Sequence, residues 1–258
     1  MNILHSIILG VVEGVTEFLP ISSTGHMILV GNLLNIENSL FTKSFEIIIQ
    51  LGAIFSVVFL YWKKLWNLEN IKKLIVAFIP TGVIGLVFYK IAKTYLLGNS
   101  MVVLFSLFIG GIIFIFFEKW YQKKQKKDFI ESVDVITYKQ SFIIGIFQSI
   151  AIIPGVSRSA ASIFGGLSLG LNRATIVEFS FLLAVPTMLA ASGLDILKNH
   201  SSFTFDKIGF LLIGFVVAFI TALFSIKFLL KYIKNNNFIV FGLYRIFIAI
   251  VFYFLLFK

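Results

Sequence analysis

The sequence predicts an all-α polytopic membrane protein made of two repeats of inverted topology. Hydrophobic residues make up 59% of its 258 residues and the mean hydropathy is +0.98, whereas a soluble domain is about 45–50% apolar. Several apolar segments approach the roughly 20 residues that a helix needs to cross a bilayer. Two of the apolar stretches are broken at prolines, Pro20 and Pro154, that lie 134 residues apart. These three observations favour a duplicated bundle of membrane helices.

The chain opens with an apolar stretch, residues 3–34, that polar and helix-breaking residues interrupt. The interrupting residues are Glu13, Glu17, Pro20 and Gly25. Each half of the stretch is too short to span a bilayer alone. We therefore expect a re-entrant helical hairpin that enters and leaves on one side, because irregular backbone at membrane depth is tolerated where it lines a protein interior. Ser22, Ser23 and Thr24 are typical residues for the N-cap of the second helix.

Six further segments are long and apolar enough to be spanning helices, three in each half of the chain. They are residues 45–62, 74–92, 101–117, 176–197, 210–230 and 238–257. Residues 142–171 repeat the opening theme, with a break at Pro154. Between the halves lies a charged stretch, residues 118–139, which we expect to be a solvated cytoplasmic loop. It joins the internal repeats, residues 1–117 and 140–258, within a single membrane domain of residues 1–258.

The two halves align at a constant shift of 134 residues, which pairs Pro20 with Pro154 and Ser23 with Ser157. Each repeat would contain one re-entrant hairpin and three spanning helices. Because three is odd, the second repeat inserts upside down relative to the first. Inverted repeats with broken helices place the binding site near the bilayer midplane, where the breaks meet.

Charge sets the expected orientation. Lys and Arg are concentrated on the side that holds residues 63–73 and 118–139, so this side is predicted to be cytoplasmic and both termini to lie outside. The net charge of +10 then reflects topology and contact with membrane lipids, and no nucleic acid partner is expected. The absence of Cys excludes disulfides and thiolate ligands. The start of the chain lacks a basic region, so we expect no cleaved signal peptide.

The first break carries a dense set of reactive groups between Glu13 and His26. Ionisable residues at membrane depth are costly and therefore indicate a functional site. Glu13 and Glu17 are four residues apart and share one helix face. They could hold Mg²⁺ against phosphate oxygens, or one could donate a proton or orient His26. Ser23 with His26 offers a nucleophile and a general base, although His26 could equally be the general acid.

The second break places Ser157, Arg158 and Ser159 at the start of a helix. The free N–H groups and positive dipole end of a helix N-terminus suit an anion, and a guanidinium beside them adds charge-assisted hydrogen bonds. Ser22, Ser23 and Thr24 offer similar donors at the first break, and together the two breaks predict a phosphate or pyrophosphate site.

Simpler roles stay open for several of these residues. Ser22 is more readily a plain helix cap than a catalyst, and Ser157 and Ser159 could also act only as caps. Arg158 could form an ion pair with Glu13 or Glu17, and this pairing does not exclude phosphate binding. Structural or supporting roles are expected for four residues near the ends of spans: Glu46, Gln50, Glu178 and Arg245.

The two motifs EGVTEFLPISSTGH and PGVSRS, in this order and at this separation, resemble the bacterial undecaprenyl-diphosphatase family, the bacitracin-resistance proteins. The resemblance covers essentially the whole chain, with no departure in either motif. It implies a phosphatase of the bacterial plasma membrane that removes the terminal phosphate of undecaprenyl diphosphate, a polyprenyl diphosphate lipid, and so recycles the carrier for peptidoglycan and other wall polymers. It implies catalytic roles for Glu13, Glu17, Ser23, His26 and Arg158.

With the resemblance we expect a divalent cofactor, Mg²⁺ or Ca²⁺, and an active site that opens toward the extracytoplasmic face. The main rival is a lipid-phosphate transporter or flippase, because inverted repeats with broken helices are a transporter architecture. A combined enzyme and flippase, and a homodimer, also stay open. The hydroxyl, imidazole and carboxylates of the first break favour the enzyme, since transport needs charge complementarity but no proton-transfer groups.

Overall fold

A computed structural model describes residues 1–37, 39–96, 99–124, 132–198 and 207–257, and the regular elements in this part of the chain are helical. The α-helices are α1 (Ile3–Thr16), α2 (Ser23–Leu33), α3 (Leu40–Leu65), α4 (Leu68–Ile91), α5 (Ser100–Lys124), α6 (Tyr138–Ser149), α7 (Arg158–Ser168), α8 (Arg173–Lys198), α9 (Ile208–Ile233) and α10 (Ile239–Leu256). Three short helices are η1 (Ala92–Leu96), η2 (Val133–Val135) and η3 (Ile150–Ile152). The six helices α3, α4, α5, α8, α9 and α10 are long and apolar enough to cross a membrane, and each coincides with a predicted span.

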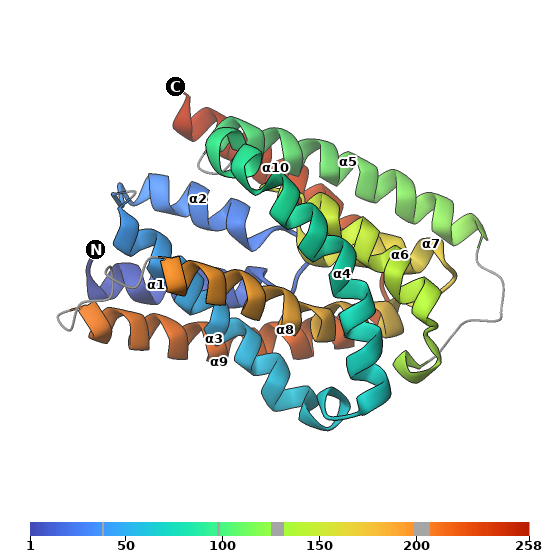
Figure 1. The fold of residues 1–258 in the computed structure, drawn as a ribbon. Helices are drawn as coiled ribbons and strands as arrows, with labels where there is room; N and C mark the ends of the chain where they lie inside the picture. Colours follow the sequence, from blue (N-terminus) through green and yellow to red (C-terminus); the bar gives the residue numbers. More distant parts are fainter. Residues whose placement is uncertain (38, 97–98, 125–131, 199–206, 258) are drawn as a thin grey trace.

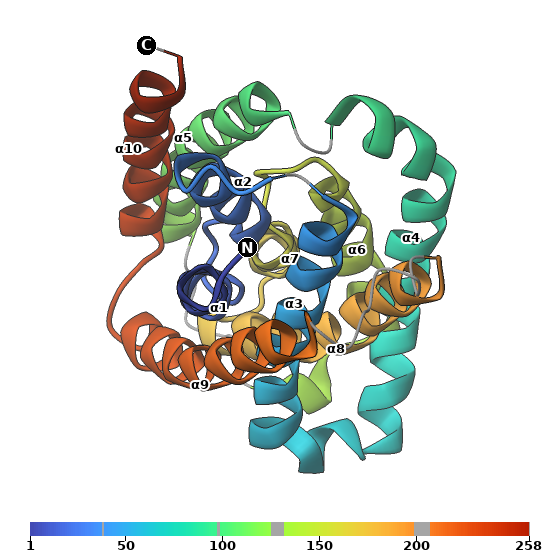
Figure 2. The same ribbon diagram turned by 90° about the vertical axis from the view of Figure 1, so that its left-hand side faces the viewer.

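The short helices lie inside a ring of long ones. Viewed from the end that carries the N-terminus, α1, α2 and α7 occupy the middle, with α4, α5, α9 and α10 around them (Figure 2). Helix α1 packs on α9, α4 on α6, and α5 on α10. The pair α1–α2 meets the pair α6–α7 near the middle of the long helices, and both chain ends lie at one end of the bundle (Figure 1). The functional motifs are therefore brought to the centre of the molecule.

Two breaks separate the central helices, and both end in the same kind of cap. The first break, residues 17–22, follows α1, and the second break, residues 150–157, follows α6. Ser22 caps α2 with φ 72°, and Ser157 caps α7 with φ 78°. The Gly25 N–H donates to Ser22 Oγ at 3.3 Å, and the Ala160 N–H donates to Ser157 Oγ at 3.2 Å. Positive φ is uncommon outside glycine and is concentrated at functional sites.

The shared cap geometry matches the two halves one residue away from the predicted register. Ser22 corresponds to Ser157, a shift of 135 residues, so Ser23 corresponds to Arg158 as the first residue of its helix. The sequence alignment had paired Ser23 with Ser157. Ser22 and Ser23 are both good caps by residue type, and only the backbone conformation decides between them.

The charged stretch before the second half differs from the solvated loop that the sequence suggested. Helix α5 continues through Lys124, and Glu118 is 1% exposed and forms an ion pair with Arg173 at the start of α8. A second ion pair joins Lys64 to Glu178, also on α8. Lys73 Nζ donates to the Asp134 carbonyl at 2.6 Å. These contacts fasten α8 and its neighbours at the end of the bundle far from the chain termini, while residues 125–131 lie outside the described part.

Candidate active site

A cavity of about 140 Å³ lies between the two breaks. It is lined by Glu17, Ser22, Ser23, Thr24, Ala151, Ile152, Ile153, Pro154, Gly155, Ser157, Arg158 and Met188. Six of the nine candidate residues from the sequence are in this lining, and they come from both motifs. The remaining three, Glu13, His26 and Ser159, lie outside it.

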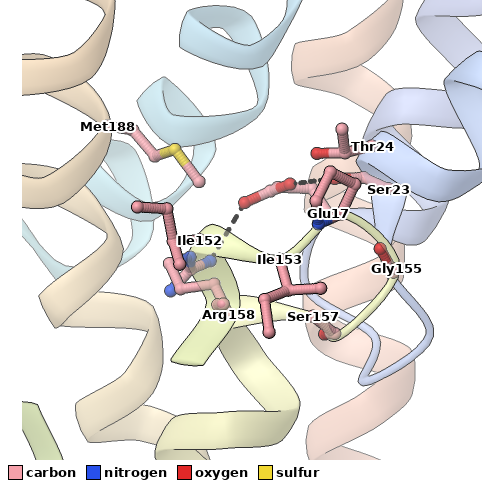
Figure 3. Close-up of a pocket in the computed structure, with 12 residues that line it drawn as sticks. Glu17, Ser23, Thr24, Ile152, Ile153, Gly155, Ser157, Arg158 and Met188 are labelled. Carbon is pink, nitrogen blue, oxygen red and sulfur yellow. Dashed lines mark hydrogen bonds and ion pairs between the residues drawn. The ribbon is translucent and has the colours of Figure 1, made fainter. Parts of the chain in front are cut away.

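Glu17 joins the two motifs through its carboxylate (Figure 3). Ser23 Oγ donates a hydrogen bond to Glu17 Oε2, and Arg158 Nη2 donates to Glu17 Oε1 at 3.0 Å. The Arg158 and Glu17 side chains are only 7% and 4% exposed. Arg158 is also fixed from the other side, since its Nη1 donates to the Ser180 carbonyl at 2.8 Å. A buried ion pair therefore orients a hydroxyl and a guanidinium toward one cavity.

The same residues leave donors free for an anion. Ser23 and Arg158 are each the first residue of a helix, where backbone N–H groups are unsatisfied and the dipole favours negative charge. Within the described residues, Arg158 Nε is buried without a hydrogen-bond partner. Buried donors are normally paired, so this arrangement fits a ligand that brings several acceptor oxygens.

His26 is held away from Ser23, which changes the pairing expected from sequence. Its Nδ1 lies 2.8 Å from the Ser22 carbonyl, and its Nε2 lies 2.9 Å from Tyr244 Oη. A carbonyl only accepts, so Nδ1 carries the proton, and in the neutral ring Nε2 accepts from the Tyr244 hydroxyl. The His26 and Tyr244 rings also stack, with centroids 5.6 Å apart. Both ring nitrogens are thus engaged, and the contact that Ser23 makes is with Glu17.

Glu13 lies one helical turn before Glu17 and is 2% exposed. Its Oε1 has no hydrogen-bond partner among the described residues. The described part contains no group of three or more His, Cys, Asp or Glu placed to hold a metal. A Mg²⁺ ion can nevertheless be held by one or two carboxylates when substrate phosphates supply the other ligands. The unpartnered oxygen of Glu13 is compatible with that kind of site.

Ser159 ties the two breaks together instead of facing the cavity. Its Oγ donates to the Phe18 carbonyl at 3.1 Å, and the residue is 1% exposed. The cavity wall opposite the polar groups is apolar, with Ile152 and Met188 facing Glu17 and Arg158 (Figure 3). The cavity is therefore amphipathic: polar groups line one side and hydrocarbon lines the other.

Sequence reasoning missed the role of α10 at this site. Tyr244 holds His26, and the neighbouring Arg245 is buried behind both breaks. Arg245 carried a signal, because it is an ionisable residue in an apolar span, but its partners are backbone atoms that leave no trace in sequence. Tyr244 and Met188 are common residue types in membrane helices and carried no such signal.

Comparison with known proteins identifies the chain's relatives. The family model described as "Bacitracin resistance protein BacA" matches residues 6–251. A protein named undecaprenyl-diphosphatase from Sulfurihydrogenibium sp. (strain YO3AOP1) is 53% identical over 253 residues, which covers 98% of this chain and 99% of the relative. Proteins of the same name from Aquifex aeolicus and Persephonella marina are 49% and 51% identical, over 96% and 98% of both chains. The chain belongs to the BacA bacitracin-resistance family.

Proposed function

We propose that this protein is an integral membrane phosphatase that hydrolyses undecaprenyl diphosphate to undecaprenyl phosphate and inorganic phosphate. The observation that carries the proposal is the Glu17 carboxylate, which contacts both Ser23 and Arg158 at two helix N-termini facing one cavity. The family relatives bear the name of this activity. Hydrolysis at this site would return the lipid carrier to the synthesis of peptidoglycan and other wall polymers.

The geometry supports a serine nucleophile with a carboxylate base. Glu17 takes the Ser23 hydroxyl proton as Ser23 Oγ attacks the terminal phosphorus, and the phosphoric anhydride bond breaks to release undecaprenyl phosphate. Water then cleaves the phosphoserine and releases inorganic phosphate. Arg158 and the helix N–H groups stabilise the charge on the transferring phosphoryl oxygens. The competing route, in which water attacks directly and Ser23 only binds phosphate, uses the same groups.

The polar side of the cavity offers further phosphate contacts from Ser22, Thr24 and Ser157. His26 fits a supporting role, because it holds the Ser22 carbonyl and so the cap that precedes Ser23. This reassigns the proton-transfer role from His26 to Glu17. Ser159 supports the site in the same indirect way, through its bond to Phe18.

The lipid nature of the substrate is supported by the amphipathic cavity. Its 140 Å³ is well below the roughly 300–1,000 Å³ of pockets that enclose a drug-sized ligand, so it suits a diphosphate headgroup and the start of an apolar chain. Ile152 and Met188 supply the hydrocarbon contact for the first isoprenoid unit. The remainder of the polyprenyl chain would lie outside the cavity among membrane lipids.

We also propose a divalent ion, Mg²⁺ or Ca²⁺, held by Glu13 and Glu17 together with substrate phosphate oxygens. The support is the buried Glu13 Oε1 that lacks a partner. When bound, the ion would neutralise phosphate charge and polarise the phosphoryl group.

The inverted repeat and re-entrant hairpins are part of the same proposal. They are supported by the matching caps at Ser22 and Ser157 and by the meeting of α1–α2 with α6–α7 at the centre (Figure 1). The distribution of Lys and Arg favours extracytoplasmic termini and an active site that opens to that face of the plasma membrane. The apolar side chains exposed on α4, α5, α9 and α10 fit contact with membrane lipids and equally with a second copy of the chain in a homodimer.

The decisive test is phosphate release by the purified full-length chain from undecaprenyl diphosphate in detergent. We expect wild-type turnover and a loss of most activity in Arg158→Lys, because a point charge cannot replace a planar fork that contacts Glu17, Ser180 and phosphate together. A lipid-phosphate flippase would use the same anion site without the Ser23–Glu17 pair. Transfer of labelled lipid across vesicles without phosphate release would refute the phosphatase and favour that alternative.

A further inference from the structure

Arg245 is a buried arginine of α10 that contacts the backbone of both breaks. The residue is 1% exposed. Its guanidinium donates five hydrogen bonds to main-chain carbonyls: Pro20 at 3.3 Å, Gly155 at 2.8 Å, Val156 at 2.9 Å, Ser106 at 3.2 Å and Leu107 at 3.5 Å. One acceptor belongs to the first break, two belong to the second break and two belong to α5.

Carbonyl groups at a break in a membrane helix lose their helical partners and must be satisfied internally. A planar guanidinium with five donors can serve several of them at once. No carboxylate lies within ion-pair distance of Arg245 in the described part of the chain, where the ion pairs involve Lys64, Arg158 and Arg173. Arg245 is therefore devoted to backbone carbonyls.

Helix α5 is shaped to admit this side chain. A Cβ at Gly110 would lie 2.2 Å from Arg245 Nη2, a distance that no real contact allows. The next residue, Gly111, faces α10 differently: its Cβ would meet the Gly242 carbonyl at 2.6 Å and Ile246 at 2.8 Å, with no guanidinium atom among its nearest contacts. The two glycines thus separate the seat of the guanidinium from the packing of the two helices.

We infer that Arg245 is a positioning residue that clamps the first break to the second and so sets Ser23 and Glu17 against Arg158. Pro20 lies three residues before Ser23, and Val156 lies two residues before Arg158. A shift of either backbone segment therefore moves a reactive side chain relative to its partner across the cavity. A misplacement of about 1 Å can cost about 100-fold in rate. The activity readout of this inference rests on the proposed phosphatase function, whereas the clamp itself does not.

The experiment uses three single variants of the full-length chain in detergent, with two measurements on each. Arg245→Lys keeps the charge but loses most of the five bonds, and Gly110→Ala keeps the arginine but displaces its guanidinium. Gly111→Ala is the matched control, because it disturbs α5–α10 packing without touching the guanidinium. The measurements are kcat and KM for phosphate release, and amide hydrogen exchange by mass spectrometry over residues 19–24 and 153–158.

We expect Arg245→Lys and Gly110→Ala each to lower kcat by about 10-fold to 100-fold, with KM within about threefold, because the loss falls on alignment in the transition state. Amide exchange should accelerate at both breaks together. The double variant should lose little more than either single variant, since both remove the same clamp. Gly111→Ala should keep kcat within about twofold while its melting temperature falls, as expected for a packing change alone.

The inference is overturned if Arg245→Lys keeps wild-type kcat and exchange, if only one break exchanges faster, or if Gly111→Ala loses as much activity as Gly110→Ala. Should either alanine variant fail to fold, Arg245→Lys decides by itself. Exchange also separates the two claims. A wild-type protein without phosphatase activity would refute the proposed function, while the exchange at the two breaks would still test the clamp.

Discussion

Replacing Glu17 with Gln tests whether its carboxylate both stabilises the site and acts as the base. Gln keeps the shape, but its single carbonyl oxygen can accept from only one of the two donors, Ser23 Oγ and Arg158 Nη2, and its amide NH₂ then faces the other. Removing one partner of a buried ion pair costs about 3–5 kcal/mol. Arg158 retains its 2.8 Å bond to the Ser180 carbonyl, so we expect a loss of about 3 kcal/mol, at the lower end of that range.

The effect on catalysis should be larger than the effect on stability. Loss of a general base lowers turnover by about 10²–10⁴-fold, so Glu17→Gln should fall by at least about 100-fold. The protein should still fold, because domains are stable by about 5–15 kcal/mol. Thermal unfolding in detergent and phosphate release from undecaprenyl diphosphate measure the two effects.

Glu178→Gln is the matched control, since Glu178 also forms an ion pair but lies outside the cavity. Its side chain and that of Lys64 are 20% and 41% exposed, and exposed pairs contribute about 0–1 kcal/mol. We expect little change in stability and near wild-type turnover. Glu17→Gln with wild-type kcat would refute the base role, and equal destabilisation by the two variants would refute the energetic importance of the Glu17–Arg158 pair.

Three further predictions concern other parts of the site and the topology. Ser23→Ala should abolish turnover with substrate binding nearly intact, whereas Ser22→Gly should cost far less, because glycine accepts the positive φ of that cap; similar losses in the two variants would contradict a special role for Ser23. Glu13→Gln should weaken the apparent affinity for Mg²⁺ in a titration of activity, and an unchanged titration would remove Glu13 from the metal site. A reporter that is active only in the cytoplasm should stay silent when fused after the last residue, and a strong signal there would contradict the inverted six-span topology.

The sequence predicted the spanning helices well because length and apolarity alone decide whether a segment crosses a bilayer. Each of the six predicted spans coincides with a long apolar helix. It also located the two breaks, since a proline ends one helix and the serines that follow it favour the start of the next. Grouping Glu17, Ser23 and Arg158 followed from this placement, and the structure brings the three into one cavity.

The details that sequence could not supply depend on three-dimensional contacts. The partner of Ser23 could not be chosen between His26 and Glu17 by spacing, because the intervening break sets their directions. The cap could not be assigned between Ser22 and Ser23, because φ is a property of the folded backbone. Glu118 was expected to be solvated since it begins a charged stretch, but a cation from a distant helix, Arg173, makes its burial possible.

The small size of the cavity has a consequence for how the reaction must be measured. A cavity of about 140 Å³ takes in the headgroup and leaves the polyprenyl tail dissolved in the bilayer, so the enzyme meets its substrate by diffusion within a surface. The relevant concentration is then the mole fraction of lipid in that surface. Adding inert detergent or phospholipid at constant total substrate should slow turnover by dilution alone, and rates from different micelles are comparable only after this correction.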